Sequence, residues 1–213
     1  MSGYPIILIG LESARCVVVG GGEVAVRKVA ALREAGARPV VISPDLCQSL
    51  QDQAERGEID TFQRAYQSGD LAGALLAIAA TDDPATNEAV WREAQTGGSL
   101  VNVVDDPAHC DFYVPATVRR GALTIAISTE GCSPALAARI REQLESLFGP
   151  EYASFLDILG ELREWITDAC PPEKRRDLWY RLVDSDLLEL IGEGKEREAR
   201  ERAIAIVSTY VEG

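Results

Sequence analysis

The sequence predicts an α/β protein that begins with a parallel, doubly wound sheet and ends in a small helical bundle. Short apolar runs alternate with helix-like segments up to about residue 104. Two β-rich runs then follow each other closely, and from residue 151 onward nearly every segment has helical periodicity. We therefore expect three parts: residues 1–111, 112–149 and 150–213.

Four apolar runs predict the strands of the parallel sheet. They are residues 16–19, 39–42, 75–80 and 100–104. Helix-like segments, such as residues 85–96, separate them. Strands that alternate with helices in this way pair in parallel and are covered by helices on both faces.

A different pattern begins after Pro107. Residues 112–118 and 122–128 are β-rich runs, and the short connection at 119–121 between them suits an antiparallel hairpin. Ser133 and Pro134 are typical of a helix start, which predicts a helix over residues 135–148.

The rest of the chain is expected to form a helical bundle. Breaks at Pro171–Pro172 and Gly192–Gly194 predict about three helices.

Charge and cysteine spacing exclude several classes of protein. The formal net charge of -13 argues against a general attraction to nucleic acid or to anionic membranes, so an anionic ligand must meet a local basic patch. The apolar stretch at residues 6–11 follows no basic segment and is soon interrupted by charge, which argues against a signal peptide or a membrane span. The five cysteines form no CxxC pair, so we expect no metal site, no disulfide framework and a cytoplasmic location.

The turn after the first apolar run carries the main binding motif. Gly20, Gly22 and Ala25 match GxGxxA, directly after a buried run and at the start of a helix. The amides and dipole of a helix N-terminus favour a pyrophosphate, so the pattern predicts a Rossmann-type domain that binds NAD. The predicted contacts here are Gly20, Gly22, Glu23 and Val24. The alternative is a glycine turn that serves packing alone.

The end of the second run departs from the usual dinucleotide fingerprint. Ser43 and Pro44 stand where an acidic residue normally holds the adenine ribose, and Asp45 follows. Serine can still bond a ribose hydroxyl, and no arginine follows directly to grip a 2′-phosphate. We therefore expect Ser43 and Pro44 to contact NAD rather than NADP.

Longer motifs resemble one enzyme family. The run Gly20–Lys28 closely resembles the GGGxVAxRK signature of the precorrin-2 dehydrogenase and sirohydrochlorin ferrochelatase family. Ala79–Asp83 is similar to the family's AATDD, Asn102–Asp105 to its NVVD, and Ser128–Pro134 to its serine-rich turn. Tyr4–Ile6 is similar to the family's opening, so the resemblance spans residues 4 to about 148.

The resemblance implies a reaction, a partner and further site residues. It implies NAD-dependent oxidation of precorrin-2, an anionic tetrapyrrole, to sirohydrochlorin during siroheme biosynthesis, and in bifunctional members the insertion of ferrous iron. It also implies a stand-alone enzyme, without the methyltransferase domain of some siroheme synthases. This enzyme would form a homodimer through the hairpin and helix of residues 112–149. It adds Thr81 and Asn102 to the expected cofactor contacts, and Ser128 and Thr129 to the substrate contacts.

Asp105 is the candidate catalytic residue. It ends the fourth apolar run, and ligands of open α/β sheets bind outside the carboxyl ends of the strands. Dehydrogenation removes a hydride and a proton, so a carboxylate there suits a general base, and the resemblance places its catalytic aspartate at this position. In the alternative reading, Asp105 or Asp106 only caps the turn before Pro107.

Arginines gather in the second part of the chain. Between residues 112 and 141 there are four arginines against Glu130 alone. Since arginine matches carboxylates bidentately, Arg119 and Arg120 are candidate contacts for a carboxylate-rich substrate. An ordinary solvated surface would show the same composition.

Two alternatives to this enzyme were considered, and one stays open. A non-catalytic NAD-sensing domain would use the same glycine turn, whereas a short-chain type oxidoreductase would need a YxxxK motif that the sequence lacks. His109, the chain's one histidine, and its neighbour Cys110 have no assigned role.

Overall fold

The computed structural model describes residues 3–212. It divides into two compact units, Met1–Val114 and Pro115–Gly213. Within the described residues, no helix combines the length and the apolar character needed to cross a membrane. The separate boundary expected near residue 149 stays a prediction.

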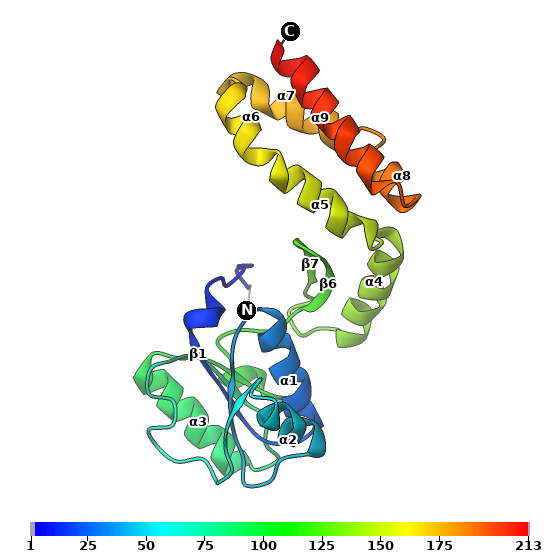
Figure 1. Ribbon diagram of the computed structural model, residues 1–213. Coiled ribbons are helices and arrows are strands. Elements are labelled where there is room, and N and C mark those ends of the chain that lie inside the picture. The colour runs from blue at the N-terminus through cyan, green and yellow to red at the C-terminus, as the bar shows by residue number, and fades with distance from the viewer. Residues whose placement is uncertain (1–2, 213) are drawn as a thin grey trace. The chain divides into compact units, whose positions relative to one another are not determined.

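The first unit is the expected parallel sheet with helices on both faces (Figure 1). Its strand order is β3-β2-β1-β4-β5, with every neighbouring pair parallel. The strands are β1 (Arg15–Val19), β2 (Val40–Ile42), β3 (Asp60–Phe62), β4 (Ala74–Ala79) and β5 (Leu100–Val103). The helices are η1 (Leu11–Ser13), α1 (Glu23–Glu34), α2 (Gln48–Glu55), α3 (Pro84–Gly97) and η2 (Pro107–His109). The predicted fold class is confirmed.

Burial on both faces explains why these strands are continuous apolar runs. Val18 and Val41 pack against α1 and α2 on one face, while Val17 and Ala77 pack against α3 on the other. Ala25, the small third residue of the glycine motif, is fully buried where α1 meets the sheet. A larger side chain there would push the helix away from the sheet.

One strand of this unit was not predicted, and one helix was expected only as a helix-like segment without bounds. The edge strand β3 has the sequence Asp-Thr-Phe and no fully buried residue, so it produces no apolar run. Helix α2 buries only Leu50 and Gln53 and carries no strong start signal. Both β3 and α2 depend on contacts with neighbouring elements, and such contacts cannot be predicted from the local sequence pattern.

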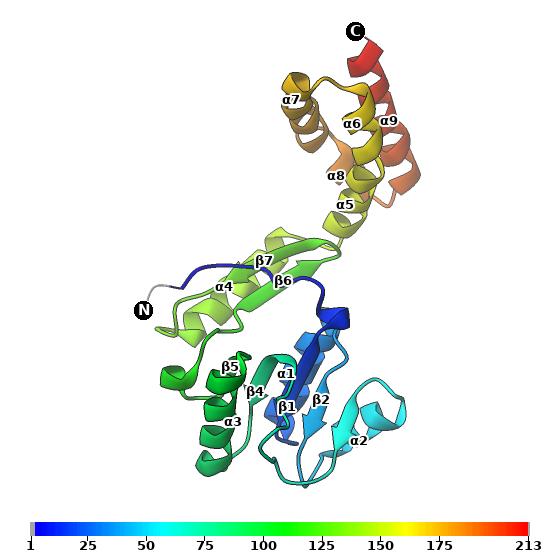
Figure 2. The same ribbon diagram turned by 90° about the vertical axis from the view of Figure 1, so that its left-hand side faces the viewer.

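The second unit opens with the antiparallel pair β6 (Ala116–Arg120) and β7 (Leu123–Ile127), followed by α4 (Pro134–Leu147), as Figure 2 shows. The hairpin prediction is correct, but its predicted turn is wrong. Arg119 and Arg120 belong to β6, where Arg120 pairs with Leu123. Gly121, with φ of 56°, begins a two-residue turn, because it adopts the left-handed conformation that such turns require.

The C-terminal region contains more helices than expected. In place of about three, the described residues form α5 (Glu151–Glu161), α6 (Arg163–Ala169), α7 (Pro172–Val183), α8 (Leu187–Gly192) and α9 (Glu196–Glu212). The predicted breaks at the prolines and glycines are present, but the breaks at Leu162 and after Val183 contain neither residue type. The helices bend there to bury one shared core that includes Ile166, Leu178 and Val207.

Candidate active site

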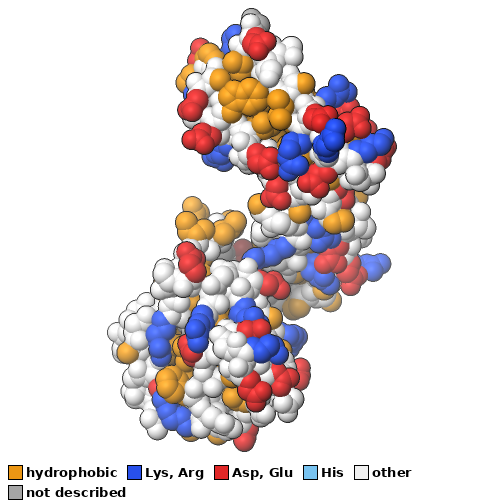
Figure 3. Space-filling model, in the orientation of Figure 1, with side chains coloured by type: hydrophobic (Ala, Val, Ile, Leu, Met, Phe, Trp, Pro, Cys, Tyr) orange, Lys and Arg blue, Asp and Glu red, His pale blue; other side chains and the backbone are white. Residues whose placement is uncertain are grey.

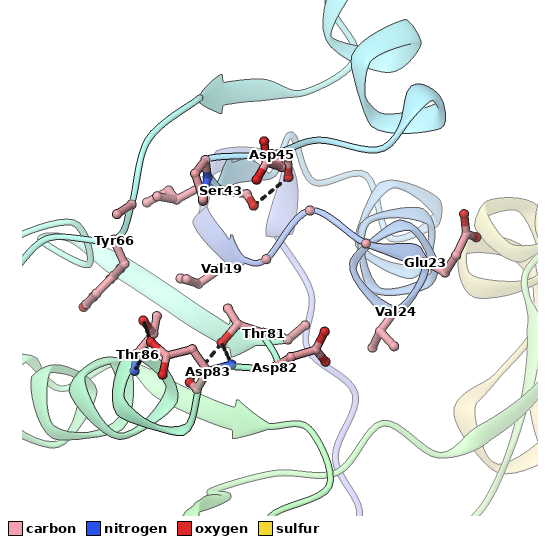
Figure 4. A pocket seen from close by; sticks show the side chains of 17 residues that line it. Val19, Glu23, Val24, Ser43, Asp45, Tyr66, Thr81, Asp82, Asp83 and Thr86 are labelled. Carbon is pink, nitrogen blue, oxygen red and sulfur yellow. Dashed lines mark hydrogen bonds between the residues drawn. The ribbon is translucent and has the colours of Figure 1, made fainter.

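A cavity of about 520 Å³ lies at the carboxyl edge of the parallel sheet (Figure 4). The glycine turn after β1 lies between the residues that follow β2 and those that follow β4. Seven of the eight predicted cofactor contacts line it: Gly20, Gly22, Glu23, Val24, Ser43, Pro44 and Thr81. Residues not predicted from the sequence also line it, among them Gly21, Asp45, Ala65, Tyr66, Asp82, Asp83 and Thr86.

The three consecutive glycines of the turn have different steric surroundings. A Cβ at Gly20 would lie 2.2 Å from the Ala80 carbonyl oxygen, and one at Gly21 would lie 1.9 Å from that of Asp45. A Cβ at Gly22 would meet nothing within 4 Å. Gly20 and Gly21 are therefore required for packing within the protein, whereas Gly22 leaves space open toward the cavity. The sequence motif did not identify Gly21, although the unbroken glycine run was its available signal.

The start of α1 gives the cavity an anion-binding end. Gly22 is the N-cap of α1, and the backbone amides of the following turn have no partner within the helix. These amides and the helix dipole favour a pyrophosphate, and the open space at Gly22 lets one approach. The cavity thus fits the NAD that the sequence predicts.

The residues after β2 form a tight support beneath the glycine turn. The buried Ser43 hydroxyl donates a hydrogen bond to the Asp45 carbonyl at 2.7 Å, and the Cys47 amide donates one to the Gly21 carbonyl at 2.9 Å. The Ser43 oxygen can still accept a hydrogen bond from a ribose hydroxyl.

The residues after β4 are fixed from α3. The Asn87 amide donates to the Thr81 carbonyl at 3.0 Å, and the Thr81 hydroxyl lies 2.8 Å from the Asn87 Oδ1. Asp83 caps α3 by accepting hydrogen bonds from the Ala85 and Thr86 amides. Its bond from the Thr86 hydroxyl, followed by these amides, lowers the pKa of Asp83.

The charges around the cavity are all of one sign. Within the described part of the chain, its lining includes Glu23, Asp45, Asp82 and Asp83 but no lysine or arginine. Carboxylates can accept hydrogen bonds from ribose hydroxyls but repel a further phosphate. The lining therefore favours NAD over NADP.

Asn102 lies outside this cavity lining. Its side chain is buried and donates to the Phe112 carbonyl at 2.9 Å and to the Cys110 sulfur at 3.4 Å. These bonds anchor the chain where it returns alongside β5. The predicted cofactor contact of Asn102 stays untested.

Asp105 and Asp106 follow β5 and have different surroundings. Asp105 has a left-handed backbone with φ of 61°, is exposed, and accepts no hydrogen bond from any of residues 3–212. Asp106 Oδ2 lies 2.5 Å from His109 Nδ1, which lowers the pKa of Asp106. The half-buried Lys28 of α1 interacts electrostatically with Asp105, although burial is the larger effect and lowers the pKa of Lys28.

His109 and Cys110 are held by local contacts. His109 Nε2 lies 3.8 Å from Glu88 Oε2, and its ring packs edge-on against Trp91. The Cys110 sulfur lies 3.2 Å from the carbonyl oxygens of both Val103 and Asp106, which share its one proton, and burial raises the pKa of this thiol. No group of three or more potential metal ligands occurs among the residues that the structure describes.

The predicted substrate contacts belong to the second unit. Arg120 donates to the Phe148 and Glu145 carbonyls at 2.8 and 3.2 Å, so it caps the end of α4. Ser128 Oγ accepts from the Glu130 amide, and Thr129 Oγ1 accepts from the Ser133 amide.

The other two arginines of this region are paired within α4. Arg139 bonds Glu142, and Arg141 bonds Glu145. Both carboxylates lie just beyond the stretch in which the sequence shows an excess of arginine. The local positive charge is therefore smaller than that stretch suggests.

Comparison with known families identifies the chain. A family model described as putative NAD(P)-binding matches residues 7–116, which is more than half of the 213 residues. A model of the sirohaem biosynthesis protein central region matches residues 120–147, and one of the sirohaem synthase dimerisation region matches residues 151–205. The chain belongs to the family that the first model describes as putative NAD(P)-binding, and most of its remaining length matches the two sirohaem models. The family resemblance inferred from the sequence motifs is thus confirmed.

Related proteins agree with this membership. The siroheme synthase of Nitrosococcus oceani is 39% identical over 197 residues, which is 92% of this chain and 42% of that protein. The siroheme synthase of Chromobacterium violaceum is 39% identical over 201 residues, which is 94% of this chain and 43% of that protein. The chain thus spans about two fifths of the length of these relatives.

A solved structure matches along its whole length. It is SirC, described as a precorrin-2 dehydrogenase, with a TM-score of 0.77 and 26% sequence identity over 95% of this chain and 100% of that one. The complete match shows that the two chains share one architecture.

Substitutions at neighbouring glycines separate packing from cofactor binding. We expect Gly22→Asp to abolish NAD binding without unfolding, because its side chain and negative charge would occupy the open space of the pyrophosphate end. Gly21→Ala should instead lower the melting temperature, because its Cβ would collide with the Asp45 carbonyl. Calorimetric titration with NAD and thermal melts check both. Unchanged NAD affinity in folded Gly22→Asp would contradict the site.

Proposed function

We propose that this chain oxidises precorrin-2 to sirohydrochlorin with NAD as the oxidant. The observation that carries the proposal is a glycine-turn cavity that fits NAD, at the same sheet edge as the unbonded carboxylate of Asp105. The complete match to a precorrin-2 dehydrogenase supports the choice of substrate. An anaerobic assay of precorrin-2 with NAD, followed by NADH absorbance, tests it. A non-catalytic NAD-sensing domain would bind NAD and give no turnover.

The cofactor is held by backbone groups at one end of the cavity and by polar side chains elsewhere. The amides after Gly22 would bind the pyrophosphate, and Ser43 and Thr81 would bond the sugars. We keep Glu23, Val24, Pro44 and Asn102 as proposed contacts. When bound, NAD supplies the hydride acceptor for the oxidation.

Asp105 takes the proton that leaves with the hydride. Its carboxylate is exposed and unbonded, whereas the neighbouring Asp106 is bound to His109. The left-handed turn at Asp105 gives the two adjacent side chains different surroundings. A free carboxylate can accept a proton without first breaking a bond.

The substrate's carboxylates meet the second unit in this proposal. Arg119, Arg120, Ser128 and Thr129 are the proposed contacts. Arg120 also binds two carbonyls at the end of α4, so it has a structural role beside the proposed one. Arginine suits this role because its planar fork matches a carboxylate.

Iron insertion is a separate part of the proposal. Ferrous iron would be a substrate, and the macrocycle itself would supply its nitrogen ligands. The protein then needs only a base for the displaced pyrrole protons, which Asp105 can provide.

A homodimer and a cytoplasmic location complete the proposal. The match of residues 151–205 to a dimerisation region supports the homodimer, although this region follows the hairpin and helix of residues 112–149 through which the sequence predicted pairing. Hydrophobic side chains also gather on the C-terminal helices (Figure 3), where Trp165, Tyr180 and Val183 are exposed. The free thiols of all five cysteines suit the reducing cytoplasm.

Replacing the proposed base tests its role. We expect Asp105→Asn to lower NADH production from precorrin-2 by a factor of roughly 100 to 10,000, with NAD affinity little changed. Asp106→Asn is the matched control, since it makes the same change one residue away, and we expect it to stay within a few-fold of wild type. Steady-state assays of both variants give the comparison.

The same variant also examines iron insertion. Loss of oxidation with retention of ferrous iron insertion into sirohydrochlorin would show that the reactions use different bases. Near wild-type oxidation in folded Asp105→Asn would remove Asp105 from the mechanism.

Single serine substitutions separate the two hairpin arginines. Arg119→Ser should raise the KM for precorrin-2, more so at low salt, with NAD affinity unchanged. Arg120→Ser should lower the melting temperature, because the carbonyls of Phe148 and Glu145 lose their donor. Kinetics at two salt concentrations and thermal melts distinguish the effects. Equal losses of NAD and precorrin-2 binding in Arg119→Ser would argue for a structural role.

Light scattering measures the proposed homodimer. We expect a mass of about twice 23.0 kDa at micromolar concentration. Tyr180→Asp, at an exposed position of α7, should shift the mass toward the monomer, because it places a charge on a proposed apolar interface. A monomer mass for the unaltered chain would contradict the homodimer.

A further inference from the structure

The loop between β3 and β4 forms one wall of the glycine-turn cavity. Ala65 and Tyr66 of this loop line the cavity, and Figure 4 shows Tyr66 on the opposite side from Val24 and the start of α1. Among the described residues that line the cavity, Tyr66 is the one aromatic. No sequence motif pointed to this loop.

Glu93 of α3 fixes the loop from behind. Its Oε2 accepts hydrogen bonds from the Tyr66 hydroxyl at 2.6 Å and from the Gly69 amide at 2.9 Å. Its Oε1 accepts one from the Leu71 amide at 2.8 Å. One carboxylate thus binds both the aromatic side chain and the backbone of the loop. Burial, and then the bond to Glu93, raises the pKa of Tyr66, so its hydroxyl stays protonated and donates.

A second carboxylate closes the same loop. Asp70 accepts two hydrogen bonds from the Arg64 guanidinium, at 2.7 and 2.8 Å, and another from the Gln67 amide at 2.8 Å. The Arg15 side chain of β1 donates to the Asp70 carbonyl at 3.1 Å. These bonds hold the loop against the sheet before any ligand binds.

The strand order indicates which half of a dinucleotide meets this wall. The glycine turn follows β1, at the centre of the order β3-β2-β1-β4-β5. Asp105 follows β5 on one side of that centre, while Tyr66 follows β3 on the other. With the pyrophosphate at the glycine turn and the reacting half toward Asp105, the adenosine half extends toward Tyr66.

We propose that Tyr66 forms the adenosine-binding wall of the cavity and that Glu93 is the positioning residue that holds it there. The inference rests on the proposed NAD site. With its hydroxyl bonded to Glu93, Tyr66 offers the ligand its ring. A ring and loop fixed in advance lower the ordering cost of binding. Stacking of a base on an aromatic ring changes affinity by roughly 5- to 150-fold.

Fragments of the cofactor can test this assignment. We would measure binding of NAD, ADP-ribose and nicotinamide mononucleotide by calorimetry to the full chain. The variants are Tyr66→Ala, Tyr66→Phe and Glu93→Gln. Glu88→Gln is the control, since it makes the same change on α3 at a residue outside the cavity lining.

The expected pattern is specific to the adenosine half. Tyr66→Ala should lower the affinity for NAD and for ADP-ribose at least tenfold. Tyr66→Phe, which keeps the ring, should lower these affinities less than about threefold. Glu93→Gln should lower the affinity for NAD and ADP-ribose about tenfold, because the glutamine amide cannot accept all three of the hydrogen bonds that Glu93 accepts. Nicotinamide mononucleotide affinity should not change, and Glu88→Gln should match wild type. In turnover, Glu93→Gln should raise the KM for NAD and leave kcat at saturating NAD unaltered.

Other results would overturn the inference or the function beneath it. The role of Tyr66 and Glu93 would be overturned by unchanged ADP-ribose affinity in Tyr66→Ala. It would also be overturned if the variants lost equal affinity for ADP-ribose and nicotinamide mononucleotide. In either case, NAD binding by the wild type would still support the proposed function. Absence of NAD binding by the wild type would instead refute the proposed function itself. Melting temperatures identify any variant that fails to fold. If Tyr66→Ala does not fold, Tyr66→Leu, which removes the ring but keeps an apolar side chain, carries the test together with Glu93→Gln.

Discussion

Two close backbone contacts at the carboxyl edge of the sheet constrain the geometry of the whole site. Gly20 lies against the Ala80 carbonyl and Gly21 against the Asp45 carbonyl, at distances that leave no room for a side chain. These contacts bring the ends of β1, β2 and β4 together and aim the start of α1 into the space between them. The anion-binding end of the cavity exists because three separate segments pack around a turn made only of backbone.

Near this turn, neighbouring side chains of the same chemical type differ in their hydrogen-bond partners. Asp105 and Asp106 are adjacent, but the left-handed backbone at Asp105 leaves its carboxylate unbonded while Asp106 binds His109. The surroundings of these two side chains, more than their chemical type, distinguish them.

Acidic residues support the cavity in two different ways. Asp83 accepts hydrogen bonds from the amides at the start of α3, and Glu93 accepts hydrogen bonds from amides of the loop between β3 and β4. Asp45 and Asp82 instead add negative charge to the cavity lining. A strongly acidic chain can still offer an anion-binding end because the amides at the start of α1 are backbone groups rather than side chains. The acidic lining then discriminates against an additional phosphate.

The sequence by itself determined the parallel sheet, the glycine turn and the family, because apolar runs, glycines and long motifs are local features of the chain. It did not reveal β3, Tyr66, Glu93 or the two extra C-terminal helix breaks, because each depends on partners distant in sequence, as in the 27-residue separation of Tyr66 and Glu93. Tertiary structure also decided that Asn102, within a family motif, bonds the chain beside β5. A motif specifies which residues are present, but packing decides which of them reach the cavity and which hold it in shape.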